Sequence, residues 1–290
     1  MKQLKNILFG IVLGIANIIP GISAGTMAVV LGIYDETVYS IAHFTRQKRK
    51  SFFFLLPLVI GIGAGIVLFA KLMEYLLASY PAPTNLFFIG IILGSIPMIY
   101  KRATVERFKI SHLIPFLVAL AMMVAMFLFS PEETTAVSYQ LTTFGYFLMF
   151  LSGVLAAAAM VIPGISGSFL MLMLGQYNTI ISAVSDFYWP ILLIFGLGAI
   201  VGIIGVSKVI TILLSKFPQA MYFGILGFVV GSIPQLIPPI GLNLQTLIGA
   251  ATLIAGTLIA YFSSTGKNNP KKGAIADGNP AAAQQEPLKP

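Results

Sequence analysis

Long stretches without a charged residue constrain this chain more than any other feature. Residues 110–130, 141–185 and 217–266 contain no Asp, Glu, Lys or Arg. A helix crosses a bilayer with about 20 apolar residues, and each stretch reaches that length. Only 9% of the 290 residues are charged, whereas a soluble domain has about 25%. The segments lack the alternating pattern of barrel strands. The chain is therefore predicted to be an all-α polytopic membrane protein.

The composition also argues against several classes of function. The net charge is +8, yet the basic residues are scattered over short loops, which is not the stripe of a nucleic-acid partner. With no Cys and two His, the sequence offers no thiolate or imidazole cluster for a metal. No nucleophile stands with a base, so we expect neither a cofactor nor an enzyme.

An internal duplication divides the chain. The Pro-Gly-Ile-Ser motif at 20–23 recurs at 163–166, and the Gly-Ser-Ile-Pro motif at 94–97 recurs at 231–234. Two copies of one unit are therefore expected. The predicted parts are a first repeat at 1–130, an extracytoplasmic linker at 131–140, a second repeat at 141–263 and a disordered cytoplasmic tail at 264–290.

Positive charges predict the sidedness of the chain. Lys2 and Lys5 precede the apolar segment 6–33 and the basic run 46–50 follows it, so this segment begins and ends on the cytoplasmic face. Divided at its Pro-Gly pair, it gives arms of about 14 residues, which are too short to cross. A re-entrant hairpin is predicted, and symmetry suggests another at 143–181.

Three further spans follow each hairpin. Because three is an odd number, the second copy must begin on the opposite face from the first. We expect two inverted repeats, each a re-entrant helical hairpin plus three transmembrane helices, with both termini in the cytoplasm. Inverted repeats with broken helices are typical of transporters that bind their substrate near the membrane midplane.

The tips of the two hairpins form the predicted binding site. At each tip a half-helix begins inside the membrane, so its free N–H groups suit an anion such as phosphate. Glycines permit close backbone approach and hydroxyls can donate hydrogen bonds. The alternative is that these residues only start and cap a helix. The predicted phosphate-binding residues are Gly21, Ser23, Gly25, Thr26, Gly164, Ser166, Gly167 and Ser168.

Four more polar residues within apolar segments are candidates. Lys71 and Lys208 occupy matching positions, where each can bind an anionic headgroup or extend its amine to the interface. Glu74 lies on the same helical face as Lys71, so it can carry a coupling proton or neutralise the lysine. Asn17 precedes the first break, where it can satisfy freed carbonyls or donate to substrate.

Polar residues at the predicted cytoplasmic boundary are expected to be solvated. Asp35 and Glu36 end the first hairpin on that side. His43 and His112 lie in or beside loops, without the partners of a catalytic or metal site. None of the four is expected to take part in chemistry.

The motifs at 20–26 and 163–168, with the two Gly-Ser-Ile-Pro segments, resemble the bacterial polyprenyl-phosphate (undecaprenyl-phosphate) translocase family, formerly a membrane domain of unknown function. The resemblance covers about residues 1–262. It implies a flippase that moves undecaprenyl phosphate, the carrier lipid of peptidoglycan and other envelope polymers, from the outer to the inner leaflet of the bacterial cytoplasmic membrane. The implied partners are this lipid substrate and membrane lipids, and the oligomeric state is left open.

A phosphate headgroup must be sheltered while it crosses hydrocarbon, because it carries a charge of about −1.5 to −2. Hairpin tips could shelter it while the repeats alternate their exposure between the two faces. The alternative function is a small-anion channel or exchanger that uses the same half-helix N-termini. A lipid phosphatase or transferase is disfavoured, because no nucleophile and base stand together.

Overall fold

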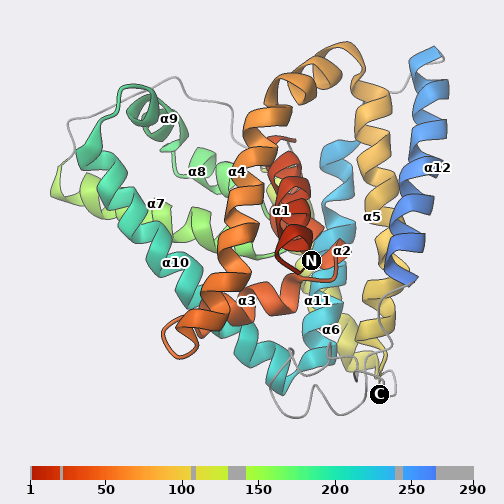
Figure 1. The fold of residues 1–290 in the computed structure, drawn as a ribbon, viewed down its shortest axis with the longest axis horizontal. Helices are drawn as coiled ribbons and strands as arrows, with labels where there is room; N and C mark the ends of the chain where they lie inside the picture. Colours follow the sequence, from red (N-terminus) through yellow and green to blue (C-terminus); the bar gives the residue numbers. More distant parts are fainter. Residues whose placement is uncertain (1, 20–21, 106–108, 130–141, 239–243, 266–290) are drawn as a thin grey trace.

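The computed structural model describes residues 2–19, 22–105, 109–129, 142–238 and 244–265. Every regular element in these ranges is a helix (Figure 1). Pro20, Gly21, the linker at 131–140 and the tail from 266 onward lie outside the described residues. The elements are α1 (Lys2–Ile18), α2 (Ala24–Val30), α3 (Tyr34–Ala42), α4 (Lys48–Ser79), α5 (Pro81–Ala103), η1 (Ile110–His112), α6 (Leu113–Leu128), α7 (Thr143–Val161), α8 (Gly167–Met173), α9 (Tyr177–Ser185), α10 (Trp189–Lys216), α11 (Pro218–Gly231), η2 (Ile233–Leu236) and α12 (Leu244–Thr265).

Seven of the described segments are long and apolar enough to cross a membrane. Six of them are the spans expected after the two hairpins, namely α4, α5, η1 with α6, α10, α11 with η2, and α12. The seventh is α7, the first arm of the second hairpin, whereas α1 in the first hairpin is apolar but shorter. The prediction of an all-α, multi-pass membrane protein is confirmed.

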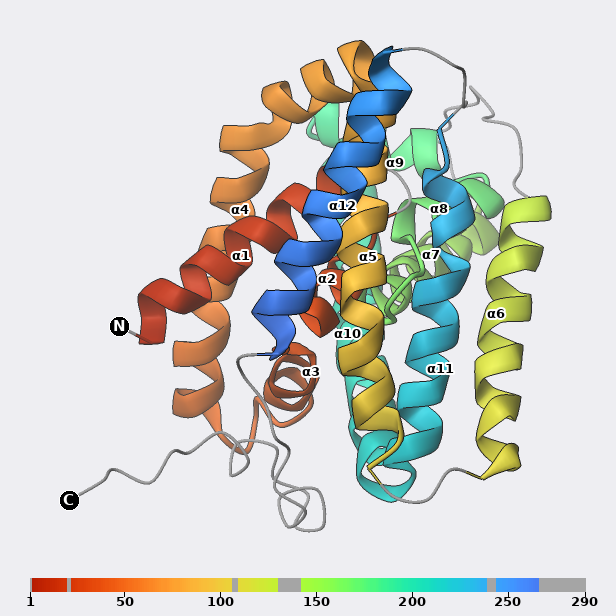
Figure 2. The ribbon, with the colours of Figure 1, turned by 90° about the vertical axis from the view of Figure 1, so that its right-hand side faces the viewer.

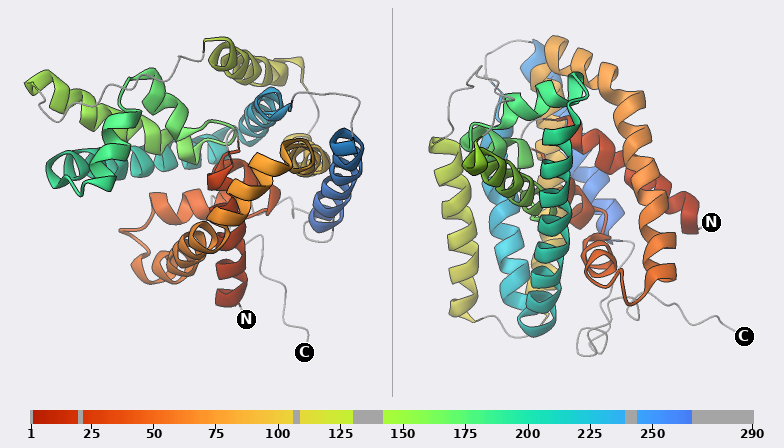
Figure 3. Two further views of the ribbon diagram at one scale, coloured as in Figure 1. Left: turned by 90° about the horizontal axis from the view of Figure 1, so that it is seen from above. Right: turned by 90° about the vertical axis from the view of Figure 1, so that its left-hand side faces the viewer.

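Four long helices lie side by side in the order α12, α5, α11 and α6 (Figure 2). The last helix of each half thus packs against the other half, because α6 contacts α11 and α12 contacts α5. On the other side of the molecule, α1 crosses α4 and α7 crosses α10 (Figure 3). The two halves are therefore interlocked rather than separate bodies.

Glycines make these crossings close, and they do so at the same places in both halves. A Cβ atom added to Gly61 of α4 would overlap with the carbonyl oxygen of Ile7 in α1. In the second half, a Cβ atom on Gly198 of α10 would overlap with the carbonyl oxygen of Phe150 in α7. Small residues allow backbones to approach in this way within a membrane. The other closely packed glycines in matching positions are Gly10 with Gly153, Gly65 with Gly202, Gly90 with Gly227 and Gly94 with Gly231.

Each hairpin has a second break, which the sequence analysis did not predict. Gly32 adopts a positive φ of 71° after α2, and the N–H of Ile33 donates to the carbonyl of Ala28 at 2.9 Å. Gly175 ends α8 in the same way, with a φ of 66°. This is the Schellman arrangement, which stops a helix at a left-handed glycine. As a result α2 and α8 have seven residues each, so their dipoles are smaller than expected for longer half-helices.

Candidate functional site: the hairpin tips and a buried ionic cluster

The two hairpin tips touch each other in the interior of the molecule. Thr26 in α2 is 1% exposed, and its hydroxyl accepts a hydrogen bond of 2.7 Å from the N–H of Gly164. The hydroxyl of Ser23 lies 3.5 Å from the carbonyl oxygen of Ile162. A Cβ atom on Gly25 would come within 3.0 Å of the carbonyl oxygen of Val161. The structure thus brings Thr26 of the first motif into contact with Gly164 of the second.

At the first tip, the hydroxyls of Ser23 and Thr26 are already hydrogen-bonded to backbone groups of the protein. Ser23 is the N-cap of α2, and its hydroxyl accepts from the N–H of Gly25 at 3.1 Å. Both Ser23 and Thr26 are buried. Their hydroxyls therefore satisfy backbone groups that would otherwise be unpaired at the break, which agrees with the capping alternative for this tip.

The second tip is more accessible. The hydroxyls of Ser166 and Ser168 lie 2.7 Å apart, and the side chain of Ser168 is exposed. Ser166 stands at the N-cap of α8, but its side chain makes no capping hydrogen bond. Gly164 has a φ of 87°, and Gly167 leaves no room for a Cβ atom beside the carbonyl of Ala156. These glycines shape the tip by packing, while the two serines present hydroxyls at its surface.

The other predicted site residues make no hydrogen bond or ion pair with the tips among the described residues. Lys71 and Lys208 are exposed on α4 and α10. Glu74 is exposed as well, and it forms no salt bridge with Lys71. Asn17 is exposed near the end of α1, and Gly21 lies outside the described residues.

A partly buried ionic cluster links the two halves, and the sequence did not predict it. Asp35 in α3 pairs with Arg102 in α5, with 3.2 Å between the carboxylate oxygen and the guanidinium nitrogen. Tyr222 in α11 donates its hydroxyl hydrogen to the same carboxylate oxygen. Arg102 also donates to the hydroxyl of Tyr222 at 3.1 Å. The expectation that Asp35 is solvated is wrong, because its carboxylate bonds to Arg102 and Tyr222, which lie on two helices that are distant in the sequence.

The limited exposure of these side chains explains why all three bond to one another. The side chain of Arg102 is 14% exposed and that of Asp35 is 26% exposed. Pairing stabilises these two charged side chains, because a charge shielded from water without a partner raises the free energy of the folded state. The guanidinium also lies 5.8 Å from the centre of the Tyr222 ring, which adds a cation–π contact. No local pattern indicates the cluster, since Asp35 lies 67 residues from Arg102 and 187 from Tyr222.

The duplication does not give this cluster a symmetric counterpart among the described residues. Asn178 occupies the position in the second repeat that Asp35 occupies in the first, and Asn85 occupies the position matching Tyr222. The packing differs accordingly: α3 packs against α10, whereas α9 makes no comparable packing against α4 among the described residues. No group of three or more His, Cys, Asp or Glu side chains that could hold a metal occurs among the described residues.

Comparison with known proteins places the chain in a family. Residues 13–248 match the VCA0040-like family, which is described as undecaprenyl phosphate translocase-like. A polyprenyl-phosphate transporter from Vibrio cholerae is 31% identical over 252 residues, covering 82% of this chain and 79% of that protein. A polyprenyl-phosphate transporter from Staphylococcus aureus is 33% identical over 272 residues, covering 90% of this chain and 96% of that protein.

No solved structure matches the chain. The family match covers most of the sequence, including both hairpin tips and all three residues of the ionic cluster. Both of these relatives carry the names of transporters rather than of enzymes. From these matches we conclude that the chain belongs to the undecaprenyl phosphate translocase-like family of membrane transporters.

Proposed function

We propose that this chain transports polyprenyl phosphate across the bacterial cytoplasmic membrane. The observation that carries the proposal is that two proteins named polyprenyl-phosphate transporters align with 82% and 90% of the chain at 31% and 33% identity. In this proposal the headgroup of undecaprenyl phosphate moves from the outer to the inner leaflet. That direction returns the carrier lipid for another round of peptidoglycan and envelope polymer synthesis.

The proposed architecture is a pair of inverted repeats, each with a re-entrant hairpin. The path of the chain in Figure 2 supports it, because α4 and α10 run in opposite directions, as do α5 and α11, and α6 and α12. The glycine crossings that recur at matching positions support it as well. With both termini in the cytoplasm, α3 would lie at the cytoplasmic end and α9 at the outer end.

The phosphate site in this proposal lies at the contact between the tips. Ser166 and Ser168 are the ligands that the geometry favours, because Ser168 is exposed, Ser166 is partly exposed, and no backbone group of the described residues bonds to their hydroxyls. Ser23 and Thr26 hold the floor of the site through their bonds to the backbone. The isoprenoid tail would remain in lipid while the headgroup passes the tips.

Alternating access requires contacts that close one end of the path and later break. The cluster of Asp35, Arg102 and Tyr222 suits that role, because it ties α3 and α5 to α11 of the other half. The packing of α3 against α10 closes the same end. In this proposal the structure is a state closed toward the cytoplasm, and the ionic cluster opens when the headgroup is released there.

The test follows the headgroup between the leaflets of liposomes that contain the purified protein. The double variant Ser166→Ala/Ser168→Ala is compared with Ser185→Ala/Ser215→Ala, whose hydroxyls bond to carbonyls of their own helices. A hydrogen bond to a charged group contributes about 1.5–3 kcal/mol. Transport by the tip variant should therefore fall at least tenfold, while the control variant keeps its rate.

Equal transport by the two double variants would contradict a phosphate site at the tips, but it would not contradict the transport function. Absence of protein-dependent lipid movement would contradict the function itself. Chloride flux in liposomes without polyprenyl lipid would then favour the small-anion channel or exchanger.

A further inference from the structure

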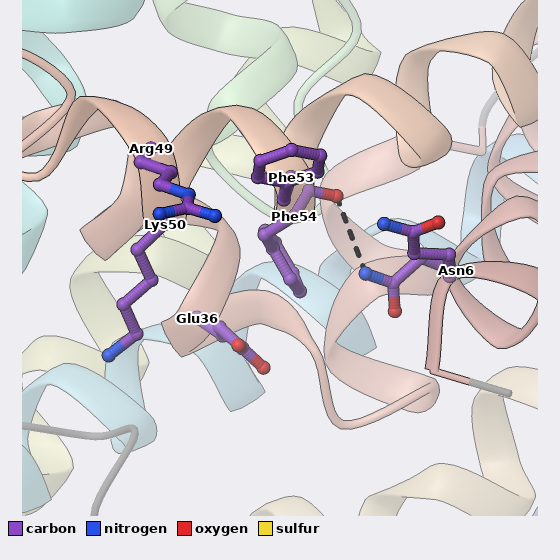
Figure 4. A pocket seen from close by; sticks show the side chains of 7 residues that line it. Asn6, Glu36, Arg49, Lys50, Phe53 and Phe54 are labelled. Atoms are coloured by element: carbon purple, nitrogen blue, oxygen red, sulfur yellow. Dashed lines mark hydrogen bonds between the residues drawn. The ribbon is translucent and has the colours of Figure 1, made fainter.

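A cavity of about 520 Å³ lies between the beginnings of α1, α3 and α4. It is separate from the hairpin tips. Arg49, Lys50 and Phe53 line it from α4, Glu36 from α3 and Asn6 from α1 (Figure 4). Nothing in the transport proposal uses these residues, so the chemistry of the cavity needs its own explanation.

The charges around this cavity favour an anion. The first turn of α4 carries Lys48, Arg49 and Lys50 and no acidic residue, although the N-terminus of a helix is itself a partial positive charge. Among the described residues that line the cavity, Glu36 is the only acidic one. The structure gives Arg49 and Lys50 no salt bridge with any described residue. Like charges gathered at the positive end of a helix repel one another, and a bound anion would relieve that repulsion.

Neutral hydrogen-bonding groups complete the polar side of the cavity. Asn6 is buried, and its amide donates to the carbonyl of Phe54 with a distance of 3.4 Å. That bond fixes the amide at the wall of the cavity. Gln3 adds a second carboxamide from the same helix. Guanidinium, ammonium and carboxamide groups together are donors suited to the oxygens of a phosphate.

The apolar side of the cavity indicates that the phosphate belongs to a lipid. Phe53 and Phe54 form part of the wall, and Phe53 is 49% exposed. Beyond them the outer faces of both helices continue with exposed apolar residues, including Leu4 and Leu8 on α1 and Leu56 on α4. The basic run ends where the apolar stretch of α4 begins, which is the arrangement of a membrane boundary. A headgroup in the cavity would therefore have its chains against an apolar surface.

The second repeat does not offer the same site. Asp186 and Phe187 occupy the positions that match Arg49 and Lys50, counted with the alignment that pairs Lys71 with Lys208. An acidic and an aromatic residue thus replace the two cations just before α10 begins. The pair of cations that lines the cavity therefore has no counterpart at the matching positions of the second copy.

We propose that this cavity binds the phosphate headgroup of an anionic lipid in the leaflet at the N-terminal end of α4. Arg49 and Lys50 contact the phosphate oxygens, Asn6 and Gln3 line the site with carboxamides, and the phenyl rings contact the start of the acyl chains. The proposal does not depend on which molecule passes the hairpin tips. Basic pockets between membrane helices on the cytoplasmic side bind anionic headgroups in this manner.

The test measures lipid binding to delipidated full-length protein in a non-ionic detergent by native mass spectrometry. Phosphatidylglycerol, phosphatidylcholine and inorganic phosphate are added in separate arms. Arg49→Gln/Lys50→Gln is compared with Lys101→Gln/Lys216→Gln, which removes two exposed cations elsewhere. Each basic residue near a membrane surface contributes about 1 kcal/mol, which is about a fivefold change in affinity. Phosphatidylglycerol binding should fall about 30-fold or more in the cavity variant and less than about threefold in the control.

A second variant gives a gain that a folding defect cannot imitate. Glu36→Gln removes the carboxylate from the lining, so phosphatidylglycerol binding should strengthen by about fivefold. Equal binding of phosphatidylcholine, equal losses in the two double variants, or unchanged binding after Glu36→Gln would each overturn the proposal. Displacement of the lipid by millimolar inorganic phosphate would also overturn it, because the site would then recognise free phosphate without the apolar contacts.

Discussion

The two predicted hairpins have helices of similar length but different connections to the rest of the protein. Both break at a left-handed glycine, Gly32 in the first and Gly175 in the second. Only the first carries Asp35, which binds Arg102 and Tyr222. Related copies can therefore share their helix breaks while a single position, Asp35 in the first and Asn178 in the second, decides which helices are joined by an ion pair.

The largest loss of stability is expected from substitutions at the glycines where helices cross. Gly61→Ala and Gly198→Ala should each destabilise the protein by about 3 kcal/mol or more, because the added methyl meets backbone that cannot move aside. Thermal unfolding in detergent micelles measures the change. The matched controls are Gly63→Ala and Gly196→Ala, which have open space around the new methyl and should be neutral or slightly stabilising.

Unequal losses at Gly61 and Gly198 would contradict the equivalence of the two crossings. A loss at Gly63 as large as at Gly61 would show that glycine is needed for a reason other than close packing.

The ionic cluster should respond next most strongly. Asp35→Asn should cost about 2 kcal/mol, less than for a fully buried pair because the side chains keep some contact with solvent. Glu74→Gln, at an exposed carboxylate without a salt bridge among the described residues, should change stability by less than about 0.5 kcal/mol. Denaturant unfolding in micelles compares the two.

A double-mutant cycle tests whether the halves are coupled through this cluster. Asp35→Asn and Tyr222→Phe should show a coupling of about 1–2 kcal/mol, since the two side chains share a hydrogen bond. Additive effects would mean that the contact contributes nothing to holding α3 against α11.

The contact between the tips should give a smaller loss. Thr26→Val keeps the shape of the side chain but leaves the N–H of Gly164 without its acceptor, at a cost of about 1–2 kcal/mol. Thr211→Val is the control, because the hydroxyl of Thr211 donates to a carbonyl of its own helix. Chemical unfolding of both variants measures the difference, and equal stabilities would mean that the tips do not depend on each other.

The exposed lysines should give the smallest effect. Lys71→Gln and Lys208→Gln should each change the free energy of unfolding by less than about 0.5 kcal/mol, because both side chains are exposed. Unfolding of the two variants, measured side by side, checks this. A loss above about 1 kcal/mol in one half alone would reveal a partner for that lysine and break the symmetry of the pair.

Much of the fold follows from short-range features of the sequence. The uncharged stretches at 110–130 and 217–266 contain the helices α6, α11 and α12. Pro81 and Pro218 begin α5 and α11 at matching positions, because proline suits the first turn of a helix. The breaks after α2 and α8 also had a local signal in Gly32 and Gly175, although their meaning was missed.

The site was predicted less completely. The two motifs were expected to come together, and Thr26 and Gly164 do touch. Ser23 and Ser166 were treated as equivalent, yet Ser23 is buried and Ser166 is only partly so. Whether Lys71 and Lys208 bind substrate stays a prediction.

Apolar length, proline and glycine in the sequence were enough to predict a helical chain that crosses the membrane several times. Internal similarity predicts two related copies, and that organisation stays a prediction. Only the tertiary structure decided which polar groups are buried and which partners they find. Asp35 illustrates the reason, since its partners lie 67 and 187 residues away. Such contacts form only when the packed helices bring distant residues together and exclude part of the water around their charges.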